Sequence, residues 1–289
     1  MIDVNTKILG LIGYPLGHSI SPLLHNHTIR EKNLNYVYLP FSIEADNLAD
    51  AVKGFRAINV RGFNVTIPYK EKVIPYLDKI DPLAEKIAAV NTIVNDDGLL
   101  TGYNTDLTGI IRMIKEEGNF EIKGKKVMIV GAGGAARASG IAVLSEGADQ
   151  VYLVNRTISK SAKLTEEWQR YYPDVKIYNA GLDVELYKDF IGDIDLLIDT
   201  TPVGMSPNID VPPVIKAEYL HSNMLVVDLV YNPQETSLLK AAKDVGAVHL
   251  NGLGMLLYQG IESFKIWTSF EINVNSWKDL LKKTARKLD

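Results

Sequence analysis

The stretch KKVMIVGAGGAARASGIAVL, residues 125–144, decides the fold of the middle of the chain. Lys126–Val130 is a short apolar run that leads directly into the glycine-rich turn GAGGAA and then into a helical pattern. In this G-x-G-x-x-A spacing, one glycine permits the tight turn, the next lets a pyrophosphate approach the backbone, and the small third residue lets helix and strand pack closely. The stretch predicts a dinucleotide bound at a helix N-terminus, and a glycine-rich turn without a ligand is the alternative. The residues expected at the cofactor are Gly131, Ala132, Gly133, Gly134 and Ala135.

Further apolar runs lie on the C-terminal side of this turn, at Val151–Val154, Asp195–Asp199, Leu225–Leu229 and Val248–Leu250. Segments long enough for helices separate most of them. Short runs that are apolar throughout are typical of parallel strands buried on both faces of a sheet. We therefore expect an α/β fold in which the middle of the chain is a doubly wound, Rossmann-type sheet.

The first third of the chain shows a second alternation of strands and helices. Lys7–Ile12 and Tyr36–Phe41 are predicted strands, and the helix between them is expected to begin with Ser21 as its N-cap. A helix over Asn47–Ile58 and a strand over Gly62–Val65 follow. This order predicts a separate α/β layer structure of the βαβ type.

The end of the chain is expected to be helical. An apolar stripe runs from Leu257 through Ile261 and Phe264 to Trp267, and a second amphipathic stretch extends from Trp277 to Leu288. We expect these helices to fold back onto the first domain and to bracket a cleft.

Composition excludes several classes of protein. The 289 residues are 46% hydrophobic and carry a formal net charge of −4, which gives no broad electrostatic attraction to a nucleic acid or an anionic membrane. The absence of cysteine excludes disulfides, thiolate metal sites and cysteine nucleophiles. The uncharged stretch Ile8–Ile29 is interrupted by prolines, histidines and hydroxyl residues, so we expect no export signal, no membrane span and a cytoplasmic location.

The end of the second strand of the dinucleotide unit indicates which cofactor is used. An NAD site places an acidic residue there, but this chain has Asn155, Arg156 and Thr157, with Lys160 soon after. A guanidinium that contacts a 2′-phosphate suits NADP. A solvated cluster at a helix start is the alternative interpretation.

Polar residues at the predicted strand ends of the first third suggest a small-molecule site. Ser19 and Ser21 stand two apart at a helix N-terminus, which can hold a carboxylate, although a turn residue and an N-cap are the simpler interpretation. Asn64 and Thr66 share one face of a strand and can meet a hydroxylated ligand together with Asn91. Lys70 and Asp106 can handle a proton, although a solvated lysine and a helix N-cap, at Asp106 or Thr105, are the alternatives.

Three loops follow apolar strands in the middle of the chain: 199–205, 228–233 and 251–255, the last of which leads to Gln259. Ligands of open α/β sheets bind at such strand ends. Glycine and methionine there let a flat nicotinamide ring approach, and ordinary turns are the alternative. His25 and His27 face different ways on a predicted helix, so we expect no metal site.

Taken together and in order, these segments resemble the shikimate dehydrogenase family over nearly the whole chain. The resemblance implies a substrate domain formed by residues 1–106 and 255–289, with an NADP domain over residues 107–254. It implies reversible, NADPH-dependent reduction of 3-dehydroshikimate to shikimate, a step toward aromatic amino acids. It also assigns the roles of individual residues: Ser19 and Ser21 at the carboxylate; Asn64, Thr66, Asn91 and Gln259 at ring hydroxyls; Tyr231 on the substrate side; Thr201, Met205, Gly252 and Met255 on the cofactor side; Lys70 and Asp106 as the catalytic pair.

Within this pair we favour Lys70 as the proton donor and Asp106 as the residue that orients it, because a buried ammonium needs a paired carboxylate. Relatives that use NAD and accept quinate tend to carry an acidic residue just after the Asn-Arg pair, where this chain has Thr157 and Ile158. Three alternatives remain: a quinate/shikimate dehydrogenase of broader substrate or NAD use, a non-catalytic NADP-binding sensor, and a methylenetetrahydrofolate dehydrogenase type. A monomer and a homodimer are both compatible with the sequence.

Overall fold

The structure is a computed structural model that describes residues 2–17 and 19–285, with the side chains of all of these except 282 and 285. It divides into two compact units. The first unit contains the chain up to Thr105 together with Gln259–Leu280, and the second contains Asp106–Tyr258 and the residues after Leu280. Leu288, the predicted end of the last amphipathic stretch, lies outside the described residues. Residue 18, which directly precedes Ser19, also lies outside them.

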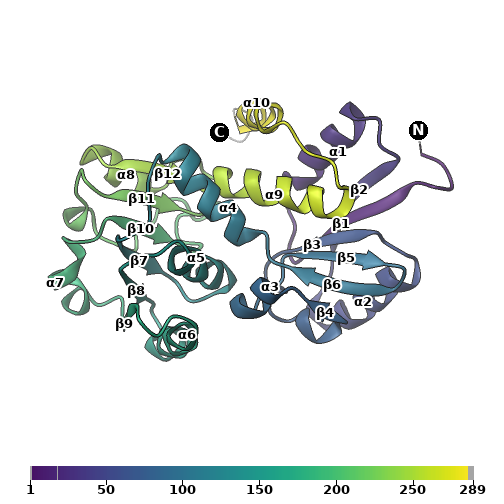
Figure 1. The fold of residues 1–289 in the computed structure, drawn as a ribbon. Coiled ribbons are helices and arrows are strands. Elements are labelled where there is room, and N and C mark those ends of the chain that lie inside the picture. The colour runs from purple at the N-terminus through teal and green to yellow at the C-terminus, as the bar shows by residue number, and fades with distance from the viewer. Residues whose placement is uncertain (1, 18, 286–289) are drawn as a thin grey trace. The chain divides into compact units, whose positions relative to one another are not determined.

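The first unit is built on a mixed sheet with strand order β2-β1-β3-β5-β6-β4 (Figure 1). Its strands are β1 (Lys7–Gly13), β2 (Tyr36–Ser42), β3 (Gly62–Val65), β4 (Lys79–Ile80), β5 (Thr92–Asp96) and β6 (Leu99–Tyr103). Strand β1 pairs in parallel with β2 and β3, as the βαβ prediction requires. The rest of the sheet, for which no strands were predicted from the sequence, is mixed: β5 runs antiparallel to both β3 and β6, and β4 pairs in parallel with β6.

The missed hairpin β5–β6 has a local sequence signal. Asp97 and Gly98 connect the two strands and have φ angles of 51° and 94°. An Asp-Gly pair with positive φ at both positions is the favoured two-residue connection between antiparallel strands. The hairpin was therefore present in the sequence as a turn signal, although its strands are short.

The helices of the first unit cover this sheet. They are α1 (Ser21–Glu31), α2 (Leu48–Ala57) and α3 (Pro82–Ile87), joined by the C-terminal helices α9 (Leu253–Thr268), in which the boundary between the units falls, and α10 (Val274–Ala285). Helix α1 corrects one prediction: its N-cap is Ile20, and Ser21 is its first residue. The prediction failed because Ser21 has the residue type of a cap but already lies inside the first turn.

Two tryptophans anchor the C-terminal helices on the first unit. The indole nitrogen of Trp267 on α9 donates to the carbonyl of Ile93 (2.9 Å), and that of Trp277 on α10 donates to the hydroxyl of Thr28 (2.7 Å). Both indoles are at most 1% exposed. Burying two aromatic side chains whose N–H groups are satisfied is a large favourable contribution to holding these helices in place.

The second unit contains a fully parallel sheet with strand order β12-β11-β10-β7-β8-β9 (Figure 1). Its strands are β7 (Lys126–Val130), β8 (Gln150–Val154), β9 (Lys176–Ala180), β10 (Leu196–Asp199), β11 (Leu225–Asp228) and β12 (Val248–Asn251). The chain starts at the centre with β7, moves outward to β9, and returns to β10 before moving outward the other way. Because crossovers between parallel strands are right-handed, the two halves carry their helices on opposite faces, which confirms the doubly wound α/β fold.

The helices of the second unit are α4 (Asp106–Arg112), α5 (Gly134–Ser145), α6 (Ile158–Tyr171), α7 (Lys188–Ile191) and α8 (Ser237–Asp244). Helix α4, whose start the sequence placed near Thr105 or Asp106, begins at Asp106 and continues beyond Arg112 as a π-helical turn, Met113–Glu117. Helix α5 packs closely on α6, because a Cβ at Gly140 would overlap the indole of Trp168. Among the described residues, no helix is both long and apolar enough to cross a membrane.

Candidate functional site

The predicted site residues of the first unit lie along one edge of its sheet. Strand β3 ends at Val65, β6 ends at Tyr103, and β5, which runs the other way, begins at Thr92. In the strand register Asn64 pairs with Thr92, and Thr92 pairs with Tyr103. Segments that are far apart in the sequence therefore bring their polar residues together at this edge.

A set of five polar side chains, here called the buried polar cluster, fills this edge. Its members are Asn64, Asn91, Thr92, Thr105 and Ser263, and each is at most 6% exposed. The hydroxyls of Thr92 and Thr105 lie 2.8 and 3.0 Å from that of Ser263. The amide nitrogen of Asn91 donates to the Thr105 hydroxyl (2.9 Å) and approaches Oε1 of Gln259 (3.4 Å). Asn64, Asn91 and Gln259, three of the residues expected to bind a ligand, thus belong to one hydrogen-bonded system.

The aromatic side chain of Tyr38 adjoins this cluster. Its hydroxyl donates to Oδ1 of Asn64 (2.8 Å), and its ring stacks on that of His25 with centroids 4.3 Å apart. Burial lowers the pKa of His25 to about 3, so this histidine is neutral at physiological pH. His25 is therefore a packed core residue, while His27 on the same helix is 39% exposed in its side chain.

The two predicted catalytic residues are held by the backbone around this cluster. Lys70 is half-buried in a turn, and its carbonyl accepts the backbone N–H of Val90 (2.8 Å). The next residue, Asn91, accepts the backbone N–H of Thr105 on its side-chain oxygen (2.8 Å). Asp106 directly follows Thr105, starts α4 and is 2% exposed. Lys70 is therefore not the freely solvated lysine of one alternative interpretation, whereas the position of Asp106 at the start of α4 is compatible with the other, a helix N-cap at Asp106 or Thr105.

The serines of the predicted carboxylate site lie at the start of α1. Ser21 is 8% exposed, while Ser19 is half-buried and its hydroxyl lies 3.4 Å from the backbone nitrogen of Ser21. Thr66 follows β3 and is half-buried, and its backbone N–H donates to Ile12 at the end of β1 (2.9 Å). These residues share the edge of the sheet occupied by the buried polar cluster.

The first unit also has a hollow of about 440 Å³, but at the other edge of the sheet. It is lined by residues at the starts of β1 and β2 and near the end of β5, such as Lys7, Tyr36 and Asp96. None of the predicted ligand-binding residues line it. Size alone therefore does not identify the site in this unit.

In the second unit the glycine turn lies where the strand order reverses. Gly131 has a φ of 110°, and a Cβ there would overlap the hydroxyl of Thr200, which donates to the carbonyl of Val130 (2.6 Å). Strands β7 and β10 are neighbours, so the turn after β7 and the Thr200–Thr201 turn after β10 share one strand edge. Open α/β sheets bind dinucleotides at this switch point.

The same turn has room for a phosphate group. Gly133 is the N-cap of α5 and is exposed, and no described heavy atom beyond its chain neighbours lies within 4 Å of a Cβ placed on it. Gly133 lies at the start of a twelve-residue helix, whose first N–H groups have no acceptors within the helix and can bind an anion. The residues present therefore fit a dinucleotide pyrophosphate.

The remaining predicted cofactor residues follow β8, β10 and β12. Asn155 donates to the carbonyl of Thr157 (2.9 Å), which shapes the turn before α6, and Arg156 and Lys160 are exposed. A Cβ at Gly252 would overlap the carbonyl oxygen of Leu229, so only glycine fits there. The other predicted residues range from open to buried: Met205 is 45% exposed, Met255 is 9% exposed, and Thr201 and Tyr231 are half-buried. Burial raises the pKa of Tyr231.

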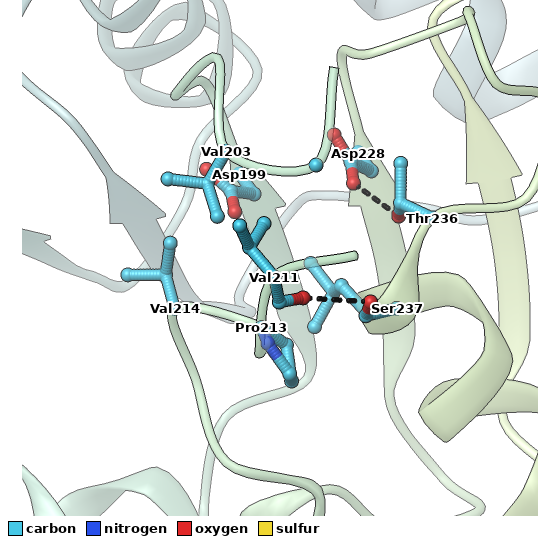
Figure 2. A pocket seen from close by; sticks show the side chains of 10 residues that line it. Asp199, Val203, Val211, Pro213, Val214, Asp228, Thr236 and Ser237 are labelled. Carbon is cyan, nitrogen blue, oxygen red and sulfur yellow. Dashed lines mark hydrogen bonds between the residues drawn. The ribbon is translucent and has the colours of Figure 1, made fainter. Parts of the chain in front are cut away.

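Two buried carboxyl groups lie at the strand ends from which two of these loops start (Figure 2). Asp199 and Asp228 end β10 and β11 and pair in the strand register. Burial, and for Asp199 also the charge of Asp228, raises the pKa values to about 7 and about 6. Asp199 accepts the backbone N–H of Thr201 (2.8 Å), and Asp228 accepts the hydroxyl of Thr236 (2.6 Å).

The space beside these carboxyl groups is not a ligand site. It measures about 10 Å³, roughly the size of one water molecule. Its lining is mostly apolar, with Val203, Val211 and Val214 among the residues that Figure 2 labels. The two acids therefore shape the loops that follow β10 and β11. No group of three or more His, Cys, Asp or Glu side chains in the described part of the chain is arranged to hold a metal ion.

Sequence patterns did not identify several residues of these sites. Tyr38 and Ser263 were not singled out at all, and Thr92 was noticed only as the neighbour of Asn91. For Ser263 a signal exists, because it stands four residues after Gln259 and so shares its helix face. Tyr38 offers no such signal, because it looks like an ordinary buried strand residue.

The fold and these two edges define a class of protein: an α/β protein that combines a Rossmann-type sheet with a second unit that buries amides and hydroxyls at one sheet edge. Residues 11–93 match the shikimate dehydrogenase substrate binding domain, residues 113–233 match shikimate/quinate 5-dehydrogenase, and residues 252–276 match the shikimate 5′-dehydrogenase C-terminal domain.

Whole-chain comparisons agree with these matches. Shikimate dehydrogenase (NADP(+)) of Halothermothrix orenii is 52% identical over 94% of each chain. A crystal structure of a shikimate dehydrogenase in complex with NADP⁺ is 44% identical, with a TM-score of 0.91 over 99% of this chain and 98% of that one. Shikimate 5-dehydrogenase from Listeria monocytogenes, in complex with shikimate and NAD, is 41% identical, with a TM-score of 0.90 over 97% and 98% of the two chains. The chain belongs to the shikimate dehydrogenase family.

Proposed function

We propose that this chain is an oxidoreductase that catalyses the reversible, NADP-dependent reduction of 3-dehydroshikimate to shikimate. The observation that carries the proposal is the buried polar cluster, which joins Asn64, Asn91 and Gln259 at one sheet edge in a chain of this family. A small ring bearing several hydroxyl groups matches an edge that offers several amides and hydroxyls at hydrogen-bonding spacing.

The substrate-binding roles follow from the chemistry of each side chain. Ser19 and Ser21, beside the positive end of α1, bind the substrate carboxylate. Thr66 and the three amides bind ring hydroxyls, and Tyr231 contributes an aromatic wall. We assign the substrate role to residues 1–106 and 255–289 and the NADP role to residues 107–254.

Catalysis needs a proton at the carbonyl oxygen when a hydride reaches the carbonyl carbon. When bound, NADPH supplies that hydride. Lys70 donates the proton, and Asp106 is the residue that orients the lysine, because an ammonium in a partly dry site is stabilised by a carboxylate. In the reverse direction Lys70 takes the proton back from the hydroxyl.

The choice of NADP rests on Arg156, exposed in the turn after β8, and Lys160, exposed in the first turn of α6, and no acidic residue lies between β8 and Lys160. The diphosphate is held at the glycine turn, and Thr201, Met205, Gly252 and Met255 adjoin the nicotinamide. A second candidate, a quinate/shikimate dehydrogenase that also uses NAD, is kept because the relative from Listeria monocytogenes is described in complex with NAD. We further propose a cytoplasmic enzyme, monomeric or homodimeric, that binds neither nucleic acid nor membranes.

Initial rates followed at the absorbance of the reduced nicotinamide test this proposal. Shikimate, quinate and a methylenetetrahydrofolate substrate are each offered with NADP and with NAD. Turnover of shikimate with NADP, well above every other combination, is expected. A preference for NAD or for quinate would replace the proposal with the second candidate, and NADP binding without any turnover would indicate a non-catalytic sensor.

A further inference from the structure

The hydroxyl of Ser263 occupies the centre of the buried polar cluster. It lies within 3.1 Å of Asn64 Nδ2 and of the hydroxyls of Thr92 and Thr105. It also donates to the carbonyl of Gln259, one turn earlier on α9 (2.9 Å). Because a hydroxyl has one proton, a Ser263 proton committed to this carbonyl leaves its oxygen as an acceptor toward the other partners.

The hydrogen-bonding capacity of Asn64 is nearly exhausted by protein groups. Its amide nitrogen has three acceptors at 3.1 Å: the carbonyl of Asn91 and the hydroxyls of Thr92 and Ser263. Its oxygen accepts the hydroxyl of Tyr38 at 2.8 Å. An amide carries two N–H protons and two oxygen lone pairs, so the remaining capacity is one lone pair on Oδ1.

The partners also fix which way the amide of Asn64 faces. The carbonyl of Asn91 can only accept, and Ser263 acts as an acceptor while it donates to Gln259. The opposite orientation would place Oδ1 of Asn64 against these two oxygens, which is repulsive. The N–H₂ group therefore points into the cluster, and the oxygen is the atom left for a ligand.

We propose that Ser263 is a positioning residue that makes Asn64 a hydrogen-bond acceptor toward the substrate, so that the site selects a ligand hydroxyl that donates a hydrogen bond. This inference rests on the proposed function. The inference specifies the direction of one hydrogen bond: a ring hydroxyl opposite Asn64 donates to Oδ1. An analogue with hydrogen at that position leaves the oxygen unpaired, and this is how polar sites reject ligands that lack a hydroxyl.

The test is a comparison of substrate analogues in Ser263→Ala. Shikimate and two analogues, each lacking one of the two ring hydroxyls that do not react, are assayed at saturating NADP. The unchanged enzyme is expected to lose kcat/KM steeply with one of the two analogues. In Ser263→Ala that discrimination falls about tenfold, because the amide is held by fewer acceptors and can present its N–H₂ group. The change appears mainly in KM for shikimate, and KM for NADP stays the same.

Thr268→Val is the matched control. Thr268 also lies on α9 and donates to the carbonyl four residues earlier, that of Phe264 (2.7 Å), but it makes no contact with the cluster among the described residues. Removing its hydroxyl takes away the same kind of helix bond and should leave the analogue discrimination unchanged. Tyr38→Phe provides a second variant, because it removes a donor to Oδ1 without disturbing the N–H₂ side, and the discrimination should persist.

The proposal is overturned if Ser263→Ala lowers kcat/KM equally for shikimate and both analogues, or if it leaves all three unchanged. It is also overturned if Tyr38→Phe abolishes the discrimination, because the hydroxyl of Tyr38 would then orient the amide. The proposed function fails differently, since the unchanged enzyme would then not turn over shikimate with NADP at all.

Discussion

Both sheets place buried polar side chains at the edge where ligands are expected, but they do so with different chemistry. In the first unit the buried groups are neutral amides and hydroxyls, and five of them satisfy one another in the buried polar cluster. In the second unit they are Asp199 and Asp228, two carboxyl groups in adjacent strands. The free energy of burying the first set of groups is small at any pH, because they are neutral and hydrogen-bonded. The free energy of burying the two carboxyl groups depends on their protonation.

This difference matches the ligand that each edge recognises in the proposed function. A neutral cluster provides direction, because each amide and hydroxyl offers a donor or an acceptor at a defined place. At the second edge, glycines leave open space and buried acids hold the loops in position. Asp199 holds one loop by accepting the backbone N–H of Thr201. In the proposed function, side chains of the first unit therefore provide specificity for a polar ring, and glycines of the second unit leave room for a flat cofactor.

The largest expected effect concerns the pH dependence of stability in the second unit. The pKa of Asp199 is about 7 in the folded chain, whereas an aspartate in water has an ordinary pKa of 3.8. The folded state therefore keeps a proton that the unfolded state releases, and stability falls as pH rises from about 4 to about 7, then stays level. We expect Asp199→Asn to be more stable than the unchanged protein at pH 8, by up to roughly 4 kcal/mol, with the difference vanishing near pH 4. Urea unfolding across this pH range measures it.

Asp193→Asn is the control for this titration. Asp193 is exposed, and its hydrogen bond with Lys126 lowers its pKa, so its contribution to stability is present above pH 4 and disappears as pH falls. The variant should be slightly less stable at neutral pH and unchanged in acid. If Asp199→Asn followed the same pattern, the contrast between the two edges would be wrong.

The next largest effect belongs to the proton donor. Lys70→Ala should lower kcat by about a hundredfold or more, because an essential proton donor contributes at least that much. NADP affinity, measured by fluorescence titration, should not change. Lys72→Ala removes an exposed lysine two residues away and should retain full activity. Near-normal turnover by Lys70→Ala would exclude the assigned role.

The sequence predicted well those parts that depend on local pattern. The apolar runs around β7, β8, β10 and β11 agree with the structure to within one residue, because a strand buried on both faces has an unmistakable composition. Strand β9 was missed, since Lys176–Ala180 lies at the sheet edge and is partly polar. Edge strands bury one side at most and carry a weaker signal.

The site was predictable residue by residue but not as a system. Asn64, Asn91 and Gln259 stand out as polar residues in apolar surroundings, yet their connection runs through Ser263. Ser263 stands 199 residues after Asn64 in the sequence, and its role is recognised only when α9 packs on the sheet. Likewise, the sequence shows that Asp199 and Asp228 end strands, whereas the effect of the Asp228 charge on the pKa of Asp199 is recognised only from the strand register. Long-range pairing is what a single sequence does not display.

The next effect, that of Arg156→Ala on cofactor choice, is expected to be smaller than the effect of Lys70→Ala on turnover. Arg156→Ala should reduce the ratio of kcat/KM with NADP to that with NAD by about 10- to 100-fold, since charge-assisted hydrogen bonds to a 2′-phosphate contribute 1.5–3 kcal/mol. Arg170→Ala, at the other end of α6, provides an exposed arginine without this role. An unchanged ratio in Arg156→Ala would support the solvated cluster as the correct interpretation.

The smallest predicted effect concerns NADP binding and distinguishes Gly133 from Gly131 in the glycine-rich turn. Gly133→Ala should fold normally, because a Cβ there meets no described heavy atom beyond its chain neighbours, yet it should weaken NADP binding about tenfold by occupying space needed by the pyrophosphate. Gly192→Ala, equally open but far along the chain from the turn, should change neither property.

Gly131→Ala should instead lower the melting temperature, since its φ of 110° and the overlap with Thr200 strain any side chain. Thermal unfolding and isothermal titration with NADP distinguish these cases. If Gly133→Ala bound NADP normally, the glycine-rich turn would be a purely structural feature, and the second edge would have to recognise its cofactor through the loops after β8, β10 and β12 alone.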